Sequence, residues 1–133
     1  MNYSLNYSLN DISGNTTLMA IKGINEPMEL NGNWIVNFPA GMGGPDQIDL
    51  PNLISLHTHP ADGVKYFSGT ATYVKNFIVE ASFLADNKRV FLDLGRIAVI
   101  AEVILNEQNL GILWKPPYRL DITDVVKAGE NVL

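Results

Sequence analysis

Short apolar runs with a period of two residues recur along this chain, and they restrict its fold more than any other feature. Trp34, Val36 and Phe38 alternate with other side chains, and Val90 and Leu92 do the same further on. Successive side chains of a strand point to opposite faces of a sheet, so this spacing predicts strands with one buried face. Glycine, proline and asparagine separate the runs at intervals of about 8–12 residues. The pattern predicts an all-β fold, an antiparallel β-sandwich of the jelly-roll type.

Two stretches give the most detailed expectations. The longest strand candidate, Tyr66–Val79, places Lys75, Phe77 and Val79 on one face. Ile97–Leu105 is almost continuously apolar and rich in β-branched residues, so we expect a central strand covered on both faces. The remaining strands are expected over residues 34–38, 89–94, 112–114, 118–122 and 130–133, with one helical turn over 125–128.

The composition changes near residue 28, which suggests a domain boundary. The preceding residues are rich in Asn, Ser, Thr and Gly, so we expect residues 1–28 to form an arm or linker with at most one strand. Residues 29–133 then form the sandwich. Glu130–Leu133 begins a strand that stops after a few residues and leaves backbone groups of its neighbour unpaired, so we expect a sandwich truncated in its last strand.

Charge and composition narrow the function classes. The 133 residues include 9 Lys and Arg against 14 Asp and Glu, which gives a net charge of −5. That balance disfavours the electrostatic attraction on which nucleic-acid binding depends. The absence of cysteine excludes disulfides, thiolate metal sites and cysteine nucleophiles. No apolar run approaches the ~20 residues of a membrane span, and the first residues lack the pattern of a signal peptide. We therefore expect neither a nucleic-acid partner nor a membrane partner.

Several motifs in a fixed order resemble a known group of domains. The stretches Tyr66–Tyr73, Leu92–Gly95, Ala101–Asn106 and Tyr118–Asp124 are similar to segments of the sugar-binding domain of family-two glycoside hydrolases. A narrower resemblance is to the C-terminal galactose-binding-like module of α-L-rhamnosidases of glycoside hydrolase family 106. Five motifs carry it: Leu30–Trp34, Gly43–Pro45, His59–Pro60, Gly63–Ala71 and Leu113–Pro117.

The resemblance covers Glu29–Leu133 and implies a galactose-binding-domain-like jelly roll that works as a non-catalytic accessory module. Such a module packs on a glycoside hydrolase catalytic domain and can line its substrate cleft. The family's work on external polysaccharides implies a periplasmic or extracellular location. No residue matches the family's catalytic motifs, so we expect no catalytic residue and no cofactor. Related sandwiches often hold a structural calcium ion, but no run of residues marks its ligands here.

The aromatic residues near the proline pair form the more informative of two candidate sugar-binding groups. Trp114 and Tyr118 flank Pro116-Pro117, and Arg119 follows. Sugar rings have apolar C–H faces that stack on an indole or a phenol, and a guanidinium can donate hydrogen bonds to hydroxyls. The alternative is that Trp114 and Tyr118 cover the core or dock on a neighbouring domain. Trp34, which lies in an alternating strand, is expected in the core.

The second group lies in the loop that contains both histidines. Asp62 is the best-placed loop acid and can accept hydrogen bonds from a sugar, beside His59. The ordinary alternative for Asp62 is a residue that stabilises its own turn. His57 and His59 have the spacing of two ligands on one strand face, but no third ligand is evident, so we expect surface histidines and no metal site.

Two other function classes stay open at this point. One is a free-standing lectin-like protein that binds a terminal sugar through Trp114 and Tyr118. The other is an interaction module that forms a homodimer through an open sheet edge. A sandwich fold alone does not decide among these classes.

Overall fold

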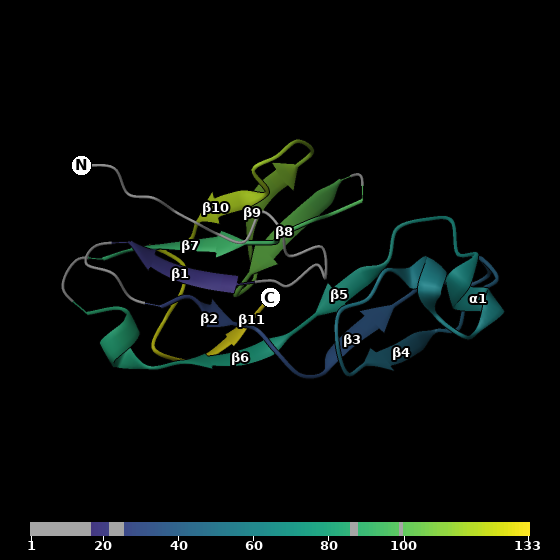
Figure 1. Ribbon diagram of the computed structural model, residues 1–133, viewed down its shortest axis with the longest axis horizontal. Helices are drawn as coiled ribbons and strands as arrows, with labels where there is room; N and C mark the ends of the chain where they lie inside the picture. Colours follow the sequence, from purple (N-terminus) through teal and green to yellow (C-terminus); the bar gives the residue numbers. More distant parts are fainter. Residues whose placement is uncertain (1–16, 22–25, 86–87, 99) are drawn as a thin grey trace.

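The computed structural model describes residues 17–21, 26–85, 88–98 and 100–133 (Figure 1). Every strand pairing in this part of the chain is antiparallel, and its helical elements have only three or four residues each. The chain is an all-β antiparallel sandwich, which confirms the fold predicted from the period of two.

One sheet has four strands in the order β10 (Arg119–Asp121), β7 (Arg89–Asp93), β1 (Thr17–Ile21) and β2 (Met28–Glu29) (Figure 1). β1 belongs to the segment that the sequence assigns to an arm, and it pairs along its whole length with β7. Residues 1–16 of that segment lie outside the described residues. The side chains by which β7 enters the core are Val90 and Leu92.

The facing sheet contains β6 (Asn76–Val79) and β11 (Gly129–Val132). The pairing continues past the end of β11, because Lys75 and Leu133 exchange both backbone hydrogen bonds, at 2.8 and 2.9 Å. The exchange extends the β6–β11 pairing by one residue, to Lys75, which directly precedes β6. β6 buries Phe77 and Val79, as the alternation predicts.

The other end of the long axis carries a three-stranded sheet in the order β4 (Gln47–Leu50), β3 (Trp34–Asn37) and β5 (Thr72–Val74) (Figure 1). Two short helical elements, η1 (Leu56–Thr58) and α1 (Asp62–Lys65), pack beside it. A further helical turn, η2 (Ala81–Phe83), follows β6. Trp34 is 4% exposed, which confirms its expected place in the core.

A hairpin of β8 (Ala101–Leu105) and β9 (Gln108–Leu113) completes the described strands. The prediction of a central strand covered on both faces is wrong for β8. Val103 and Leu105 are buried, but Ile104 on the opposite face is 48% exposed. β9 is the partner of β8 among the described strands, so the sandwich covers only the inner face of the hairpin.

The predicted strand Tyr66–Val79 is also too long at its beginning. The chain enters β5 only at Thr72, after α1 and a bend. A Cβ on Gly69 would lie 2.9 Å from the ring of Phe67, so the backbone turns tightly around that ring instead of extending. The expected helical turn after residue 124 is a hydrogen-bonded turn, in which Val125 and Val126 both donate to the carbonyl of Ile122.

The three sheets and the hairpin enclose one continuous apolar core. Lys75, at the edge of this core, is a buried cation that is only 8% exposed. Its Nζ donates to the backbone carbonyls of Asn31 at 2.6 Å and Asn33 at 2.9 Å, and burial lowers its pKa. The buried apolar residues are Leu30, Trp34, Val36, Phe38, Leu50, Val64, Phe77, Val79, Val90, Leu92, Val103, Leu105, Ile122 and Val126.

A second buried polar group, the amide of Asn131, ties three segments together. Asn131 is 1% exposed, and its Nδ2 donates to the carbonyls of Lys127 at 2.7 Å and Gly129 at 3.0 Å. Its Oδ1 accepts from the backbone N–H of Lys127 at 3.0 Å and from Nδ2 of Asn106 at 2.8 Å. Asn106 in turn bonds the carbonyl of Val125 and the backbone N–H of Val132, both at 3.0 Å. The two amides therefore join β11, the turn before it and the β8–β9 hairpin.

Replacing this buried amide is expected to be costly. Asn131→Ala leaves the N–H and carbonyl groups of the turn without partners inside the protein, so we expect a loss of about 2–4 kcal/mol of unfolding free energy. Urea unfolding measures this loss. Asn76→Ala, at an exposed position of the adjacent strand, is the control and should cost less than about 1 kcal/mol. Equal losses in the two variants would contradict the role given to Asn131.

The hairpin turn generates a second prediction, because both of its residues have a left-handed backbone. Asn106 has φ 49° and Glu107 has φ 69°. Glycine adopts this conformation without the steric penalty of a side chain, so Glu107→Gly should stabilise the protein by about 1 kcal/mol. Asn106→Gly relieves the same strain but removes the hydrogen bonds of the Asn106 side chain, so it should destabilise. Opposite shifts in the urea midpoint are the expected result, and shifts of the same sign would contradict this account.

Candidate functional site

The first candidate group lies where the chain passes from β9 to β10. Trp114 follows the last residue of β9 and is 63% exposed. Nζ of Lys115 lies 4.9 Å from the centroid of the Trp114 ring, a cation–π geometry. A cis peptide bond joins Pro116 and Pro117, and Tyr118 follows, half-buried. The segment thus presents one open aromatic ring with a cation beside it.

Arg119 has a different environment from that expected of a sugar-binding cation. It is the first residue of β10 and lies directly across from Asp93 of β7. Its Nε is 3.5 Å from Oδ2 of Asp93, and the two side chains are only 18% and 13% exposed. The pair joins two strands of one sheet, so much of the guanidinium is committed to the structure.

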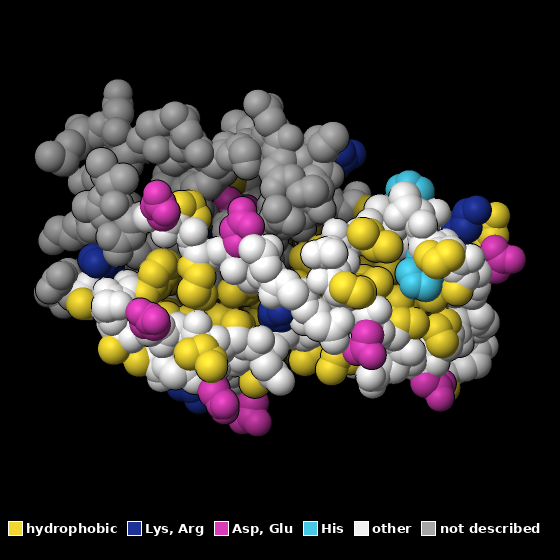
Figure 2. Space-filling view, turned by 60° about the horizontal axis from the view of Figure 1, so that its bottom comes forward, with side chains coloured by type: hydrophobic (Ala, Val, Ile, Leu, Met, Phe, Trp, Pro, Cys, Tyr) yellow, Lys and Arg dark blue, Asp and Glu magenta, His cyan; other side chains and the backbone are white. Residues whose placement is uncertain are grey.

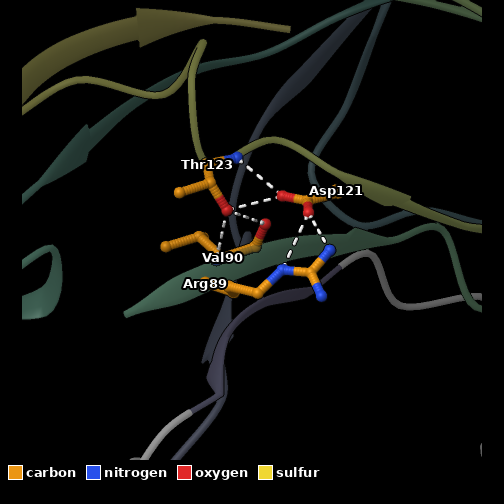
Figure 3. A network of polar contacts seen from close by, with 4 residues as sticks. All are labelled: Arg89, Val90, Asp121 and Thr123. Carbon is orange, nitrogen blue, oxygen red and sulfur yellow. Dashed lines mark hydrogen bonds and ion pairs between the residues drawn. The ribbon is translucent and has the colours of Figure 1, made fainter. Parts of the chain in front are cut away.

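A second polar network holds the same two strands together (Figure 3). Asp121 at the end of β10 accepts from Arg89 Nε at 3.1 Å, and also from Arg89 Nη2. Its other oxygen accepts from the N–H of Thr123 at 3.0 Å and from the Thr123 hydroxyl. That hydroxyl also accepts from the backbone N–H of Val90 at 2.9 Å. These bonds fix β10, and with it the position of the preceding aromatic segment.

The pKa of Asp121 reflects this network. Burial opposes ionisation, but the hydrogen bonds from Thr123 and Arg89 and the charge of Arg89 together outweigh it. The pKa of Asp121 is therefore below the ordinary value of 3.8.

The second candidate group occupies the end of the molecule formed by η1 and α1. His59 follows η1, and its Nδ1 accepts from the backbone N–H of Ala61 at 3.1 Å. His57 Nδ1 lies 2.6 Å from the hydroxyl of Ser55. Asp62 is exposed and begins α1, so it starts a helical turn. The histidines (cyan in Figure 2) lie on the surface at this end, among hydrophobic side chains.

The two groups do not form one site. Figure 1 places α1 at the far end of the long axis from β10 and the end of β9. His59 and Asp62 therefore do not join Trp114 in one site. Each group has to be considered as a separate surface.

The described residues provide no cage of side-chain ligands for a metal ion. No three histidine or acidic side chains gather within the described ranges. None of the helices in the described part of the chain is long and apolar enough to cross a membrane.

Sequence reasoning missed several exposed side chains. Tyr66 is 71% exposed, with Nζ of Lys65 5.1 Å from its ring centroid. Ile100, Ile104 and Ile112 are exposed on the outer face of the β8–β9 hairpin, although the apolar run favoured a buried strand. One residue gives a weak signal that the second face is exposed. Glu102, within the apolar run, is charged, and a charged side chain would not be expected in a strand buried on both faces. A further open hollow, not singled out before, is lined by Glu26, Pro27, Met28, Glu80, Ser82, Phe83 and Lys88.

Two relatives of this chain are both named as beta-glucuronidases. The chain is 44% identical over 126 residues to a putative beta-glucuronidase of Formosa agariphila, which covers 95% of this chain but 11% of that protein. It is 29% identical over 105 residues to a beta-glucuronidase of Bacteroides fragilis, which covers 77% of this chain and 15% of that protein. These relatives are glycoside hydrolases. No protein-family model matches the chain.

A solved structure gives the same result for the fold. The rhamnosidase from Novosphingobium sp. PP1Y matches with a TM-score of 0.71 and 38% sequence identity. The match covers 86% of this chain and 10% of the rhamnosidase chain. This chain thus corresponds to a small part, about a tenth to a seventh, of larger glycoside hydrolases.

The Asp121 network predicts a pH dependence of stability. The folded pKa is lowered, so ionised Asp121 contributes stability above about pH 3.8, and this contribution is lost as the pH falls through the folded pKa. Asp121→Asn should therefore flatten part of the acid limb of the stability curve. At neutral pH it should cost less than about 1 kcal/mol, because the ion pair is exposed. Urea unfolding between pH 2 and 7 measures both effects, and identical acid limbs in the two proteins would contradict the assignment.

Proposed function

We propose that this chain is a non-catalytic accessory module of a glycoside hydrolase of α-L-rhamnosidase-like type. The observation that carries the proposal is the unequal coverage: relatives match 95% and 77% of this chain but only 11% and 15% of their own length. A segment of this size with its own apolar core has the character of a domain. Residues 29–133 form most of its body in this proposal, and β1 of the preceding segment completes its four-stranded sheet. Its work is to pack on a catalytic domain.

The exposed ring of Trp114 supports a second part of the proposal, which is contact with carbohydrate. An indole that is 63% exposed, with the Lys115 ammonium beside it, offers a flat apolar surface and a hydrogen-bond donor. Tyr118 and Arg119 complete this group, and Arg119 also pairs with Asp93. His59 and Asp62 form a separate polar surface at the other end. The ligand class is a neutral or acidic sugar residue at the edge of a substrate cleft.

The location that goes with this function is the periplasm or the extracellular space, where polysaccharides are met. Two alternatives differ from the main proposal in their partner. A lectin-like protein would bind sugar through Trp114 without any catalytic domain. A homodimer would form through an open edge of a sheet, and analytical sedimentation distinguishes it from the monomer.

Tryptophan fluorescence tests the carbohydrate contact. Titration with rhamnose, galactose, glucuronate and plant-polysaccharide fragments should change the emission of the wild-type chain in a saturable way for at least one sugar. Trp114→Ala should remove that change, because Trp34 is buried in the core and away from solvent. Tyr66→Ala, which removes an exposed ring at the other end, is the matched control and should bind as wild type does.

The outcomes of this titration separate the alternatives. An unchanged emission of the wild-type chain with every sugar would contradict the carbohydrate contact and the lectin-like alternative, and would leave packing as the function. Hydrolysis of an aryl rhamnoside or aryl glucuronide by the purified chain would contradict the non-catalytic assignment.

A further inference from the structure

The outer face of the β8–β9 hairpin carries a strip of large apolar side chains. β8 and β9 pair so that Glu102 lies opposite Ile112 and Ala101 opposite Leu113. Extending this register by one residue places Ile100 opposite Trp114. Ile104 lies on the same face as Glu102, two residues along β8. We call Ile100, Ile104, Ile112 and Trp114 the hairpin strip.

The polar group within this face is already engaged. The carboxylate of Glu102 accepts a hydrogen bond of 2.6 Å from Nδ2 of Asn109. The Asn109 side-chain oxygen accepts from the N–H of Gly111 at 2.8 Å, where the pairing of the hairpin is irregular. These bonds hold the polar atoms along the hairpin itself, so the branched aliphatic groups dominate the surface.

The strip has the size of the largest apolar patch on an ordinary monomer. The exposed fractions of its four side chains are 59%, 48%, 57% and 63%. Together they leave on the order of 400 Å² exposed, a size at which an apolar patch on a monomer is often functional. Three of the four members are isoleucines, whose branched aliphatic groups offer neither the flat ring nor the hydrogen bonds that a sugar uses. The chemistry fits a protein surface better than a carbohydrate.

We propose that the hairpin strip is the surface on which this module docks against the adjoining domain of a larger glycoside hydrolase. The inference rests on the proposed accessory function and identifies the face that serves it. The docking partner is inferred from the relatives. The matched segment makes up only 11% and 15% of their chains, and the rest of each polypeptide is covalently attached to it.

The size of the strip favours an attached domain over a second copy of the chain. A stable interface between separate proteins buries about 800 Å² on each partner, roughly twice what the strip offers. A domain on the same polypeptide needs less contact, because its effective concentration is high. Contacts between domains of one chain are accordingly often smaller than those between separate proteins.

The position of Trp114 connects this face with the carbohydrate proposal. Trp114 is at the end of the strip, just beyond β9, whereas Ile104 and Ile112 lie within the hairpin strands. Docking through the isoleucines therefore brings the indole to the rim of the interface. A module held in this way places the open ring of Trp114 beside the neighbouring domain.

The test measures binding between two polypeptides. The complete 133-residue chain is titrated by calorimetry into the Formosa agariphila relative from which the matched segment has been deleted, after circular dichroism has shown that the deleted enzyme is folded. Wild type should bind. Ile104→Lys and Ile112→Lys should each weaken binding at least about tenfold, because a lysine charge has to be desolvated in the contact. Ile78→Lys is the matched control: Ile78 is an exposed strand isoleucine, 67% exposed, outside the strip, and the variant should bind as wild type does.

The possible results are distinct. Binding of wild type that Ile104→Lys and Ile112→Lys do not weaken, while their urea midpoints match wild type, would overturn the hairpin strip but keep the accessory function. Absence of wild-type binding to the folded enzyme, with the chain titrated to about the millimolar effective concentration of an attached domain, would overturn the accessory function and the strip with it. A wild-type dimer in sedimentation that both hairpin variants convert to monomer would assign the strip to a second copy and overturn the proposal.

Discussion

The buried amide of Asn131 is the interaction on which the arrangement of this domain depends. Its four hydrogen bonds close the turn before β11 and reach Asn106 at the tip of the β8–β9 hairpin. The hairpin lies beside the sandwich as a separate pair of strands, so its orientation relies on this polar junction as well as on the inward Val103 and Leu105. A buried polar group with all partners in place fixes geometry more narrowly than apolar contact does.

Alternation of side chains was a good guide to the fold and to the buried faces. It placed Phe77, Val79, Val90 and Leu92 correctly, because a period of two follows directly from strand geometry. It failed for the run that ends in β8, since burial on the second face depends on what packs against it. The amino-acid composition of one run does not show which segments pack against its second face. The start of β5 was missed for a related reason, as the tight packing of Gly69 on Phe67 becomes visible only in three dimensions.

The candidate binding residues were predictable one by one, but their grouping was not. Trp114 is exposed as a platform must be, yet Arg119 is held by Asp93, its neighbour across the sheet. Asp62 begins α1 and His59 precedes it, at the end of the long axis that is remote from β10. Residues that meet in a folded site can lie at any spacing and in any order along the sequence. Their separation here follows from the arrangement of the strands: β3, β4 and β5 lie with α1 toward one end of the long axis, whereas the hairpin and β10 lie nearer its middle.

This elongated layout has a consequence for how the domain takes part in a larger enzyme. When the hairpin anchors the domain, the tip that bears α1 and both histidines points away from the anchor and remains in contact with solvent. That tip presents both histidines to solvent among hydrophobic side chains.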